Sequence, residues 1–507
     1  MTDPASRPVY SRTDLNTLKT FTRGQILDAF GSFDDRVLDE ADFVLHTARL
    51  LAPESVQGLD DAQKSGDAYA VMNAVYNACK GSAAPPEKAS ISPEGLELAE
   101  GILAHRFRFY DETHQLPADI DWDFNPGTGH WGHDLNRFSY LNLLNRAYFA
   151  TGDTRFSRKA SGLILDWIAK CDIGRCFVGT PYVFGSYLNN AIQCSAWTRC
   201  LQQLLPVDQV CPKDLLRILK AMHDLMGYLE IVTNGHSGNW PTIGCNCMLA
   251  TLAAFPVFRQ TDRLATYCIS SLAHQIDDQI LPDGAQDELT PHYHRVVVNN
   301  ILNAHRSVRL LGRTLEPRTM DALRKMVHYL QQTIVPDGSA RVAFNDSDPE
   351  AVSDPRRVLS NAGLADCLSP SEGLGPELFP YAGVALLRQK QTEGDLYLAF
   401  DGGPYGRSHQ HEDKLGFWCF AYGRNFLVDP GRHLYDHSEV SYYGYLRSTR
   451  AHSTILIDGQ GQHSRSRPDT WIAHEPVPLD WQVAENEIRA SASYDLGYGP
   501  QNAIKVI

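Results

Sequence analysis

Apolar residues recur every three or four positions through the first two-thirds of the chain, the period of an amphipathic helix. In the segment 213–231, Leu215, Leu219, Met222 and Met226 share one face. Many such helices joined by short loops pack as antiparallel pairs, which predicts a helical toroid or solenoid. The same period predicts helices at 135–150, from Thr154 after a stop at Gly152, and near 188–205, 244–256, 261–278, 294–312 and 317–335.

The pattern changes after about residue 375, where short apolar runs bounded by turn residues predict antiparallel strands. A hairpin turn is expected at Gly423-Arg424. Residues 503–507 also read as the start of a strand, which is typical of a chain cut from a longer protein or of a short edge strand. The predicted strands are Gly383–Leu387, Leu396–Phe400, Leu415–Tyr422, Asn425–Val428 and Ser453–Ile457.

These patterns predict a protein with separate α and β parts. We expect an N-terminal helical segment at 1–95 and an incomplete (α/α) toroid at 96–348. A linker with three prolines follows at 349–375, with Pro376 directly after it, and an antiparallel β domain is expected at 376–507.

Composition narrows the class of partner. The 507 residues include 60 Asp and Glu against 46 Lys and Arg, a formal net charge of −14. This balance argues against a nucleic-acid binder, which needs a basic face, but it allows a local basic cleft for an anionic sugar. There is no membrane-spanning run and no signal-peptide pattern, so a cytoplasmic protein is expected if Met1 is the natural start. The eleven cysteines form no CxxC pair, which favours reduced thiols; a homo-oligomer is compatible with the sequence.

The densest group of reactive side chains is Ser408-His409-Gln410-His411-Glu412-Asp413. Two histidines at positions i and i+2 of an extended segment project to the same face. Together with Asp429 and His452, His411 would complete a zinc set of two imidazoles and one carboxylate. The alternative is that these residues are hydrogen-bonded structural residues at strand ends.

Two further groups lie in the helical part. Pro291 stands at an expected helix start, so Tyr293 and His294 fall in the first turn, where side chains face the mouth of a helical barrel. Trp240, in the loop 234–241 before another helix, could stack on a sugar ring or anchor the core.

These groups, in this order, resemble the heparinase II/III-like superfamily of polysaccharide lyases, which includes alginate and oligoalginate lyases. The resemblance covers about residues 95–465. The HxHxD, DPG and RSTxAHxT motifs are its most specific part. The matching stretches are WDFNPGTGHWGHDLNRFSYLNLLNRAYFATGD at 122–153, GNWPTIGCNCMLA at 238–250, DGAQDELTPHYH at 283–294, SHQHEDKLGFWCFAYGRNFLVDPG at 408–431 and YLRSTRAHSTILIDGQGQ at 445–462.

The resemblance implies a fold and a reaction. The family combines an incomplete (α/α) toroid with antiparallel β-sheets, and it cleaves uronic-acid glycans by β-elimination. A base removes the C5 proton of a uronate, the 4-linked sugar departs, and an unsaturated uronate remains. The substrate would be an anionic oligo- or polysaccharide, with alginate, heparan-type chains and glucuronan all open. The absence of an export signal favours an exolytic enzyme acting on oligosaccharides, and no organic cofactor is expected.

The resemblance also implies roles for residues of the helical part. Asn239 would neutralise the substrate carboxylate. Many relatives have a histidine at the next position, where this chain has Trp240, so His236 in the same loop is the candidate replacement. Tyr293 matches the catalytic tyrosine, a general acid that also serves as base in syn elimination, and His294 beside it is a candidate substrate contact.

In the β part, His409 matches the histidine that acts as base or neutraliser. His411, Asp429 and His452 match the ligands of a single zinc ion that shapes the site. Arg447 is a candidate clamp for a substrate carboxylate. In the helical part, Glu288 is a candidate for orienting a neighbouring side chain at the substrate.

Other readings remain open at this point. A zinc-dependent hydrolase with an HxHxDH motif would use the same histidines, although Lys414 stands where that motif needs its last histidine. A toroid glycoside hydrolase would need two carboxylates, for which Asp283, Asp287 and Glu288 are candidates. A non-catalytic sugar-binding protein would not depend on Tyr293.

Overall fold

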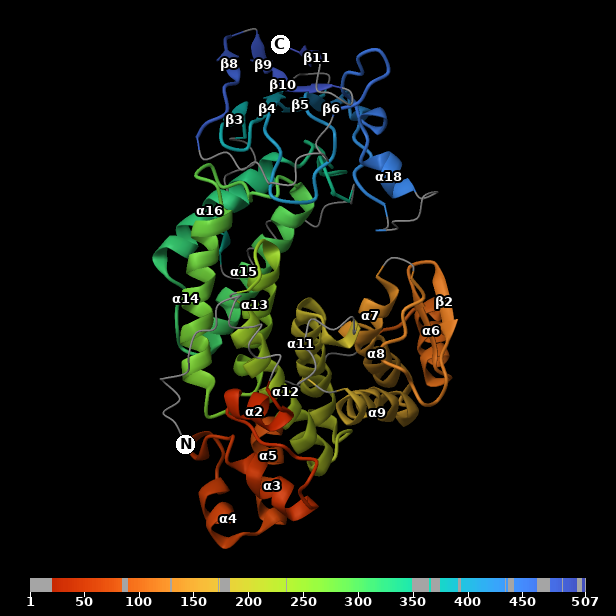
Figure 1. Ribbon diagram of the computed structural model, residues 1–507, viewed down its shortest axis with the longest axis vertical. Coiled ribbons are helices and arrows are strands. Elements are labelled where there is room, and N and C mark those ends of the chain that lie inside the picture. The colour runs from red at the N-terminus through yellow and green to blue at the C-terminus, as the bar shows by residue number, and fades with distance from the viewer. Residues whose placement is uncertain are drawn as a thin grey trace. The chain divides into compact units, whose positions relative to one another are not determined.

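Figure 1 shows a computed structural model of the chain. It describes residues 21–83, 90–127, 130–171, 173, 183–233, 235–348, 364–365, 374–390, 394–433, 435, 442–462, 475–485, 487–498 and 504–506. The chain forms two compact units. The N-terminal unit comprises Met1–Ser271 and Ser307–Thr314, and the C-terminal unit comprises Leu272–Arg306 and Leu315–Ile507. Most of the predicted linker 349–375 lies outside the described residues, and the predicted domain boundaries remain predictions.

The described part of the N-terminal unit is almost entirely helical (Figure 1). The face predicted at 213–231 is confirmed, because Leu215, Leu219, Met222 and Met226 are fully buried. The elements are α2 (Arg23–Ala29), α3 (Glu40–Ala48), η2 (Pro53–Ser55), α4 (Leu59–Ser65), α5 (Ala68–Ser82), α6 (Pro93–Leu103), β1 (Arg106–Phe109), β2 (Glu112–Gln115), α7 (Trp131–Arg137), α8 (Leu141–Thr151), α9 (Thr154–Lys170), η3 (Val183–Gly185), α11 (Tyr187–Leu204), η4 (Leu205–Val207), α12 (Pro212–Thr233) and α13 (Asn239–Ala254).

Local signals explain where several of these helices begin and end. Gly152 ends α8 in the left-handed conformation, and the Asp153 side chain caps α9 by accepting the amide of Arg155. The single helix predicted over 135–150 is instead two, because the chain breaks at Phe138 with a φ of 58°. The buried Phe138 ring packs on Trp122 and Trp197, and these aromatic contacts override the helical period.

Three further helices lead into the C-terminal unit: α14 (Thr261–Gln279), α15 (Pro291–Leu310) and α16 (Pro317–Gln332). Pro291 and Pro317 are the first residues of α15 and α16. Proline is well tolerated there because the first amides of a helix have no intrahelical partner.

The sheet of the C-terminal unit is a five-stranded antiparallel meander with the order β3-β4-β5-β6-β7. The predicted hairpin is confirmed, but its turn is Tyr422-Gly423, where both residues have positive φ, one position earlier than expected. The strands are β3 (Glu377–Phe379), β4 (Val384–Gln389), β5 (Leu396–Asp401), β6 (Gly416–Ala421) and β7 (Arg424–Leu427).

Residues 453–457, predicted as a strand, do not join this sheet and form one isolated bridge at Ile457. Side-chain hydrogen bonds run from Ser453 to the Val428 carbonyl and from Thr454 to the Lys414 carbonyl, and the Ser453 carbonyl accepts the amide of Phe417 in β6. The remaining elements are α18 (Tyr442–Leu446), η7 (Thr449–Ala451) and the hairpins β8 (Asp480–Val483) with β9 (Ile488–Ser491) and β10 (Tyr494–Tyr498) with β11 (Ile504–Val506).

One hydrophobic cluster joins the sheet to α16 and to the segment after it. Tyr329 of α16 and Phe344 pack with Phe379, Tyr397 and Trp418 of the strands. The cluster fixes the base from which the loops of the candidate site emerge.

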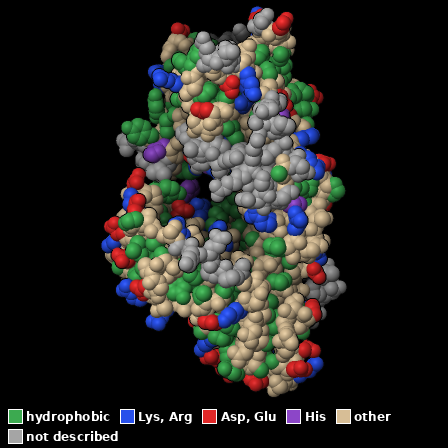
Figure 2. Space-filling model, turned by 180° about the vertical axis from the view of Figure 1, so that it is seen from behind, with side chains coloured by type: hydrophobic (Ala, Val, Ile, Leu, Met, Phe, Trp, Pro, Cys, Tyr) green, Lys and Arg blue, Asp and Glu red, His purple; other side chains and the backbone are tan. Residues whose placement is uncertain are grey.

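On the face seen in Figure 2, Lys and Arg side chains are interspersed with Asp and Glu. Among the described helices, none combines the length and apolar composition needed to cross a bilayer.

Candidate active site

Three loops of the C-terminal unit meet at Asn345. Its side chain donates to the Leu289 carbonyl at 3.0 Å and accepts the His411 amide at 2.8 Å. Its own amide donates to a carboxylate oxygen of Asp413 at 3.1 Å. One buried asparagine therefore ties the loop before α15 to the histidine-rich loop between β5 and β6.

The backbone of these loops is left-handed at Leu289, Asn345 and His409, and also at Leu415. Leu289, Asn345 and His409 have φ values of 50°, 59° and 62°. Residues other than glycine seldom adopt this left-handed backbone conformation, and those that do are concentrated at functional sites. The strain therefore marks this junction independently of the side chains that it carries.

Two glycines allow the loops to approach closely. A Cβ atom on Gly406 would lie 2.4 Å from the Asp287 carbonyl oxygen, and one on Gly431 would lie 2.0 Å from that of Ser347. Gly431 also has a φ of 59°. The sequence GGPYG before the histidines and the DPG motif thus have a steric role.

The rings of Tyr293 and His409 stack, with centroids 3.9 Å apart and planes inclined by 20°. The Tyr293 hydroxyl is 2.6 Å from the hydroxyl of Tyr435. Burial, only partly offset by Tyr435 and the nearby Arg432 guanidinium, raises the pKa of Tyr293 to about 12. Tyr293 is therefore a protonated phenol at neutral pH, suited to donate a proton to a leaving group.

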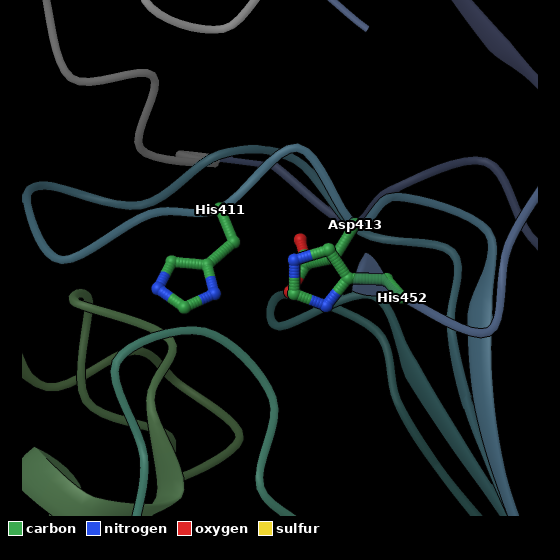
Figure 3. Close-up of side chains that lie close together, drawn as sticks. All are labelled: His411, Asp413 and His452. Atoms are coloured by element: carbon green, nitrogen blue, oxygen red, sulfur yellow. The ribbon is translucent and has the colours of Figure 1, made fainter. Parts of the chain in front are cut away.

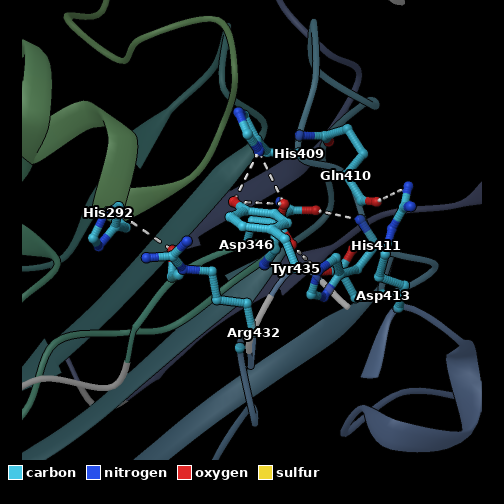
Figure 4. A network of polar contacts seen from close by, with 12 residues as sticks. His292, Asp346, His409, Gln410, His411, Asp413, Arg432 and Tyr435 are labelled. Atoms are coloured by element: carbon cyan, nitrogen blue, oxygen red, sulfur yellow. Dashed lines mark hydrogen bonds and ion pairs between the residues drawn. The ribbon is translucent and has the colours of Figure 1, made fainter. Parts of the chain in front are cut away.

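His409 is held by Asp346, whose Oδ2 lies 2.9 Å from Nδ1 (Figure 4). Burial would raise the pKa of Asp346, but its hydrogen bonds to His409 and His411 hold it well below its usual range. An ionised carboxylate only accepts, so Nδ1 carries the proton and Nε2 is left as an acceptor. Nε2 lies 3.8 Å from Glu288.

A second carboxylate, Asp348, binds two residues near Tyr293. It binds the Arg432 guanidinium through two contacts of 2.8 and 2.9 Å and lies 3.0 Å from Nδ1 of His292. The Arg432 guanidinium in turn lies over the rings of Tyr293 and Tyr435. Burial raises the pKa of Tyr293, as do the nearby carboxylates of Asp346 and Glu288, whereas the Arg432 charge lowers it.

The two histidines of the predicted zinc site come together with the carboxylate of Asp413. His411, Asp413 and His452 are buried, and one ligand atom from each lies within 4.8 Å of the others (Figure 3). Of these three residues, His411 leaves its buried Nδ1 without a hydrogen-bond partner, whereas Asp413 Oδ1 lies 3.3 Å from the Lys414 ammonium. Buried polar atoms rarely stay unpaired, so Nδ1 of His411 fits the first shell of a metal ion.

Asp429, predicted as the carboxylate ligand, lies behind His452. It is 2.7 Å from His452 Nδ1 and accepts the amide of Gly431. A carboxylate in this position fixes the tautomer and orientation of a metal-binding imidazole. The ligand role of Asp429 stays a prediction, and the geometry offers Asp413 as a second candidate for the carboxylate ligand.

Lys414, the residue that disagrees with the hydrolase motif, is buried between two carboxylates. Its ammonium lies 2.7 Å from Asp401 and 3.3 Å from Asp413. Burial would raise the pKa of Asp413, but Lys414, His452 and His411 outweigh it and lower that pKa. Lys414 therefore keeps Asp413 ionised and is itself unavailable as a ligand.

Three predicted site residues lie in the N-terminal unit. The His236 ring stacks on Tyr187 with centroids 4.4 Å apart, and Trp240 lies 5.3 Å from His236. Trp240 is 38% exposed, whereas Asn239 at the start of α13 is buried. His236 and Trp240 thus form one aromatic surface with a tryptophan face open to solvent.

Other predicted residues have partners that limit their roles. His294 is buried, its Nδ1 accepts the Gln286 amide and its Nε2 lies 2.8 Å from the Met326 carbonyl. It has no nitrogen left for a substrate, so this geometry assigns it to the core. Arg447 stacks on Tyr443 and reaches the Gln410 carbonyl at 3.4 Å, and Glu288 is buried beside His409.

The carboxylates considered for a glycoside hydrolase are also engaged. Asp283 accepts the amides of Tyr381 and Ala382, and Asp287 lies 2.7 Å from Arg407. Burial raises the pKa of Asp287 to about 7 despite Arg407. Neither carboxylate is left open for a sugar.

Sequence reasoning missed Asp346, Tyr435, Arg432 and Asp413. Asp346 follows the helical region in the polar run Asn345-Asp346-Ser347-Asp348, a signal of a functional loop. Asp413 stood inside the HxHxD motif itself. Tyr435 gave no signal, because its role depends on contacts made only in the folded chain.

Comparison with known proteins identifies two consecutive family regions, which divide the chain between residues 365 and 372. Residues 54–365 match the family described as heparinase II/III N-terminus, and residues 372–504 match the family described as heparinase II/III-like, C-terminal. A heparin-sulfate lyase of Pedobacter heparinus is 24% identical over 403 residues, covering 74% of this chain and 60% of the relative. One of Bacteroides stercoris is 22% identical, covering 80% of this chain and 67% of the relative.

Solved structures give the same fold. A heparinase III structure matches with a TM-score of 0.68 at 16% identity, covering 86% of this chain and 74% of that one. A heparan sulfate lyase of Pedobacter heparinus matches with a TM-score of 0.61 at 20% identity, covering 87% and 73%. The predicted fold class, a helical toroid followed by an antiparallel β region, is confirmed. With family matches over both parts, the chain belongs to the heparinase II/III family.

Proposed function

We propose that this protein is a polysaccharide lyase that cleaves uronate-containing glycosaminoglycans of the heparan type by β-elimination. The observation that carries the proposal is the stacked pair of Tyr293 and His409, which presents a protonated phenol beside an imidazole with an acceptor nitrogen. The names of the relatives favour heparan sulfate over alginate. The chain spans about 60% of the length of the Pedobacter relative, and the activity is proposed for the protein to which this chain belongs.

The geometry supports separate roles for His409 and Tyr293 in the elimination. Nε2 of His409 takes the C5 proton, the electron pair forms the C4–C5 double bond, and the C4–O bond breaks. Tyr293 gives its proton to the departing oxygen and is restored from solvent. We assign neutralisation of the substrate carboxylate to Asn239, on the resemblance of its sequence stretch.

The test is the ultraviolet absorbance of the unsaturated uronate. Purified protein is incubated with heparan sulfate, heparin, hyaluronan, alginate and glucuronan in separate reactions. We expect absorbance to grow with heparan sulfate and to be weak or absent with alginate. New reducing ends without absorbance would instead indicate a hydrolase. If neither signal appeared, the remaining interpretation would be a sugar-binding protein.

We further propose that His411, Asp413 and His452 hold one zinc ion and that Asp429 orients His452. The unpartnered, buried Nδ1 of His411 and the close set of two imidazoles and one carboxylate support this site. The ion, when bound, would fix the histidine-rich loop and supply a local positive charge. Catalytic proton transfer stays with Tyr293 and His409.

Metal analysis after dialysis tests the ligand set. Asp413→Asn should lower zinc affinity more than Asp429→Asn, for which a loss of about 10–100-fold is expected of an orienting residue. His452→Ala should abolish stoichiometric zinc. The proposed set is wrong if Asp413→Asn binds zinc as tightly as the wild type.

A further inference from the structure

Asp346 joins the two histidines to which different tasks are assigned. Its Oδ2 lies 2.9 Å from Nδ1 of His409, and its Oδ1 lies 2.7 Å from Nε2 of His411 (Figure 4). The residue is 1% exposed, and its amide donates to the His409 carbonyl at 3.1 Å. One rigid, buried carboxylate therefore contacts both imidazoles through separate oxygens.

We propose that Asp346 is a positioning residue that sets the tautomers of His409 and His411 together and so couples zinc binding to the placement of the catalytic imidazole. The inference rests on the proposed function and deepens it.

The argument follows from which nitrogen of each ring faces the carboxylate. A carboxylate accepts hydrogen bonds, so His409 must carry its proton on Nδ1 and His411 must carry its proton on Nε2. In the neutral form of each ring the remaining nitrogen is bare. In His409 this is Nε2, the atom assigned to proton abstraction, and in His411 it is Nδ1, the unpartnered atom at the zinc site.

The two histidines thus need opposite tautomers, and a single side chain selects both. Tyr435 extends the arrangement, because its hydroxyl donates to Asp346 at 3.2 Å and can accept from Tyr293 at 2.6 Å. Asp346 therefore contacts the proposed base His409 and the proposed zinc ligand His411. Through Tyr435 it is also linked to the proposed proton donor Tyr293.

Asp346→Asn is the critical variant. An amide has one accepting oxygen, and its NH2 group donates, so it cannot accept from both imidazoles. One histidine must turn or change tautomer. We expect zinc affinity to fall about 10–100-fold, the usual effect of losing a carboxylate behind a ligand. At saturating zinc, kcat on heparan sulfate should still fall, with KM nearly unchanged.

Asp348→Asn is the matched control for metal binding. Asp348 lies two residues further on and binds Arg432 and His292. Among the described residues it forms no hydrogen bond or ion pair with His409 or His411. The zinc affinity of Asp348→Asn, measured by competition with a chelator, should stay within about twofold of the wild type. This change is much smaller than the loss expected when an orienting carboxylate is removed. Asp346→Glu keeps two accepting oxygens and should recover part of the loss.

A measurement on the wild type covers the case that Asp346→Asn fails to fold. Nitrogen-15 spectra of histidine-labelled, zinc-free protein report the tautomer of each ring, with peaks assigned through His409→Gln and His411→Gln. Opposite tautomers are expected. The same tautomer in both rings, or unchanged zinc affinity and kcat in folded Asp346→Asn, would overturn the inference. Absence of lyase activity in wild-type protein that binds zinc would instead contradict the proposed function alone.

Discussion

Tyr293→Phe is expected to lower kcat on heparan sulfate by ~10²–10⁴-fold, the range over which positioned general acids act. The variant keeps the ring that stacks on His409 and removes only the hydroxyl. Because the pKa of Tyr293 is raised to about 12, the lost group is a proton donor throughout the neutral range. Without it, the departing sugar oxygen must leave as an alkoxide or take its proton from water.

Initial rates of ultraviolet absorbance measure this effect, with KM as a check on binding. KM should change little, because the stacked ring remains. Tyr435→Phe is the control: it removes the hydrogen-bond partner of Tyr293 and leaves the proton donor in place, so a smaller loss of kcat is expected. If Tyr293→Phe kept more than a tenth of the wild-type kcat, the hydroxyl would not be the general acid.

Lys414→Met is expected to destabilise the C-terminal unit by about 3–5 kcal/mol at pH 8, the usual cost of breaking a buried ion pair from one side. The ammonium of Lys414 is the partner of Asp401 and lies beside Asp413, and all three residues are buried. Methionine fills a similar volume, so the loss comes from two carboxylates left without a counter-charge.

The effect should depend on pH in a defined direction. Burial already raises the pKa of Asp401 to about 6 with Lys414 present, above its value of about 3.9 in an unfolded chain. A carboxyl whose pKa is raised by folding loses stability as the pH rises through these values. Removal of Lys414 raises that pKa further, so the destabilisation should be larger at pH 8 than at pH 5.

Hydrogen exchange of the β5 and β6 amides measures this loss within the unit concerned. Protection should fall by about 10²–10³-fold in Lys414→Met, given that each 1.4 kcal/mol is a tenfold change. The double variant Lys414→Met with Asp401→Asn removes one of the stranded charges and should recover part of the protection. No recovery would mean that the ammonium acts through its packing on Tyr405, whose ring centroid is 5.2 Å away.

Most of the fold could be predicted from the sequence, because the period of hydrophobic residues and the residues that form turns depend only on neighbouring positions. Gly152, Pro291 and the hairpin near Gly423 act within a few residues of their own positions. The break at Phe138 could not be predicted, because it depends on Trp122 and Trp197, which are distant in sequence. The strand expected at 453–457 failed for the same reason, since the hydrogen bonds of Ser453 and Thr454 go to Val428, Lys414 and Phe417, which are distant in sequence.

The residues of the candidate site likewise fall into those that the sequence could predict and those that it could not. Tyr293, His409, His411 and His452 carried motif signals, and the structure brings them into one unit. The choice between Asp413 and Asp429 depends on which carboxylate faces the second nitrogen of His452, a detail that spacing does not encode. The roles of Asp346 and Tyr435 likewise arise from contacts across 63 and 142 residues of sequence.

The left-handed backbone at Leu289, Asn345 and His409 has a consequence for engineering substrate range. A β-branched residue at any of these positions would add backbone strain in addition to changing the chemistry, so libraries that randomise them should yield few folded members. Trp240, exposed and at the start of a regular helix, carries no such backbone cost. Variation aimed at new glycans therefore has more freedom around Trp240 than at Leu289, Asn345 and His409.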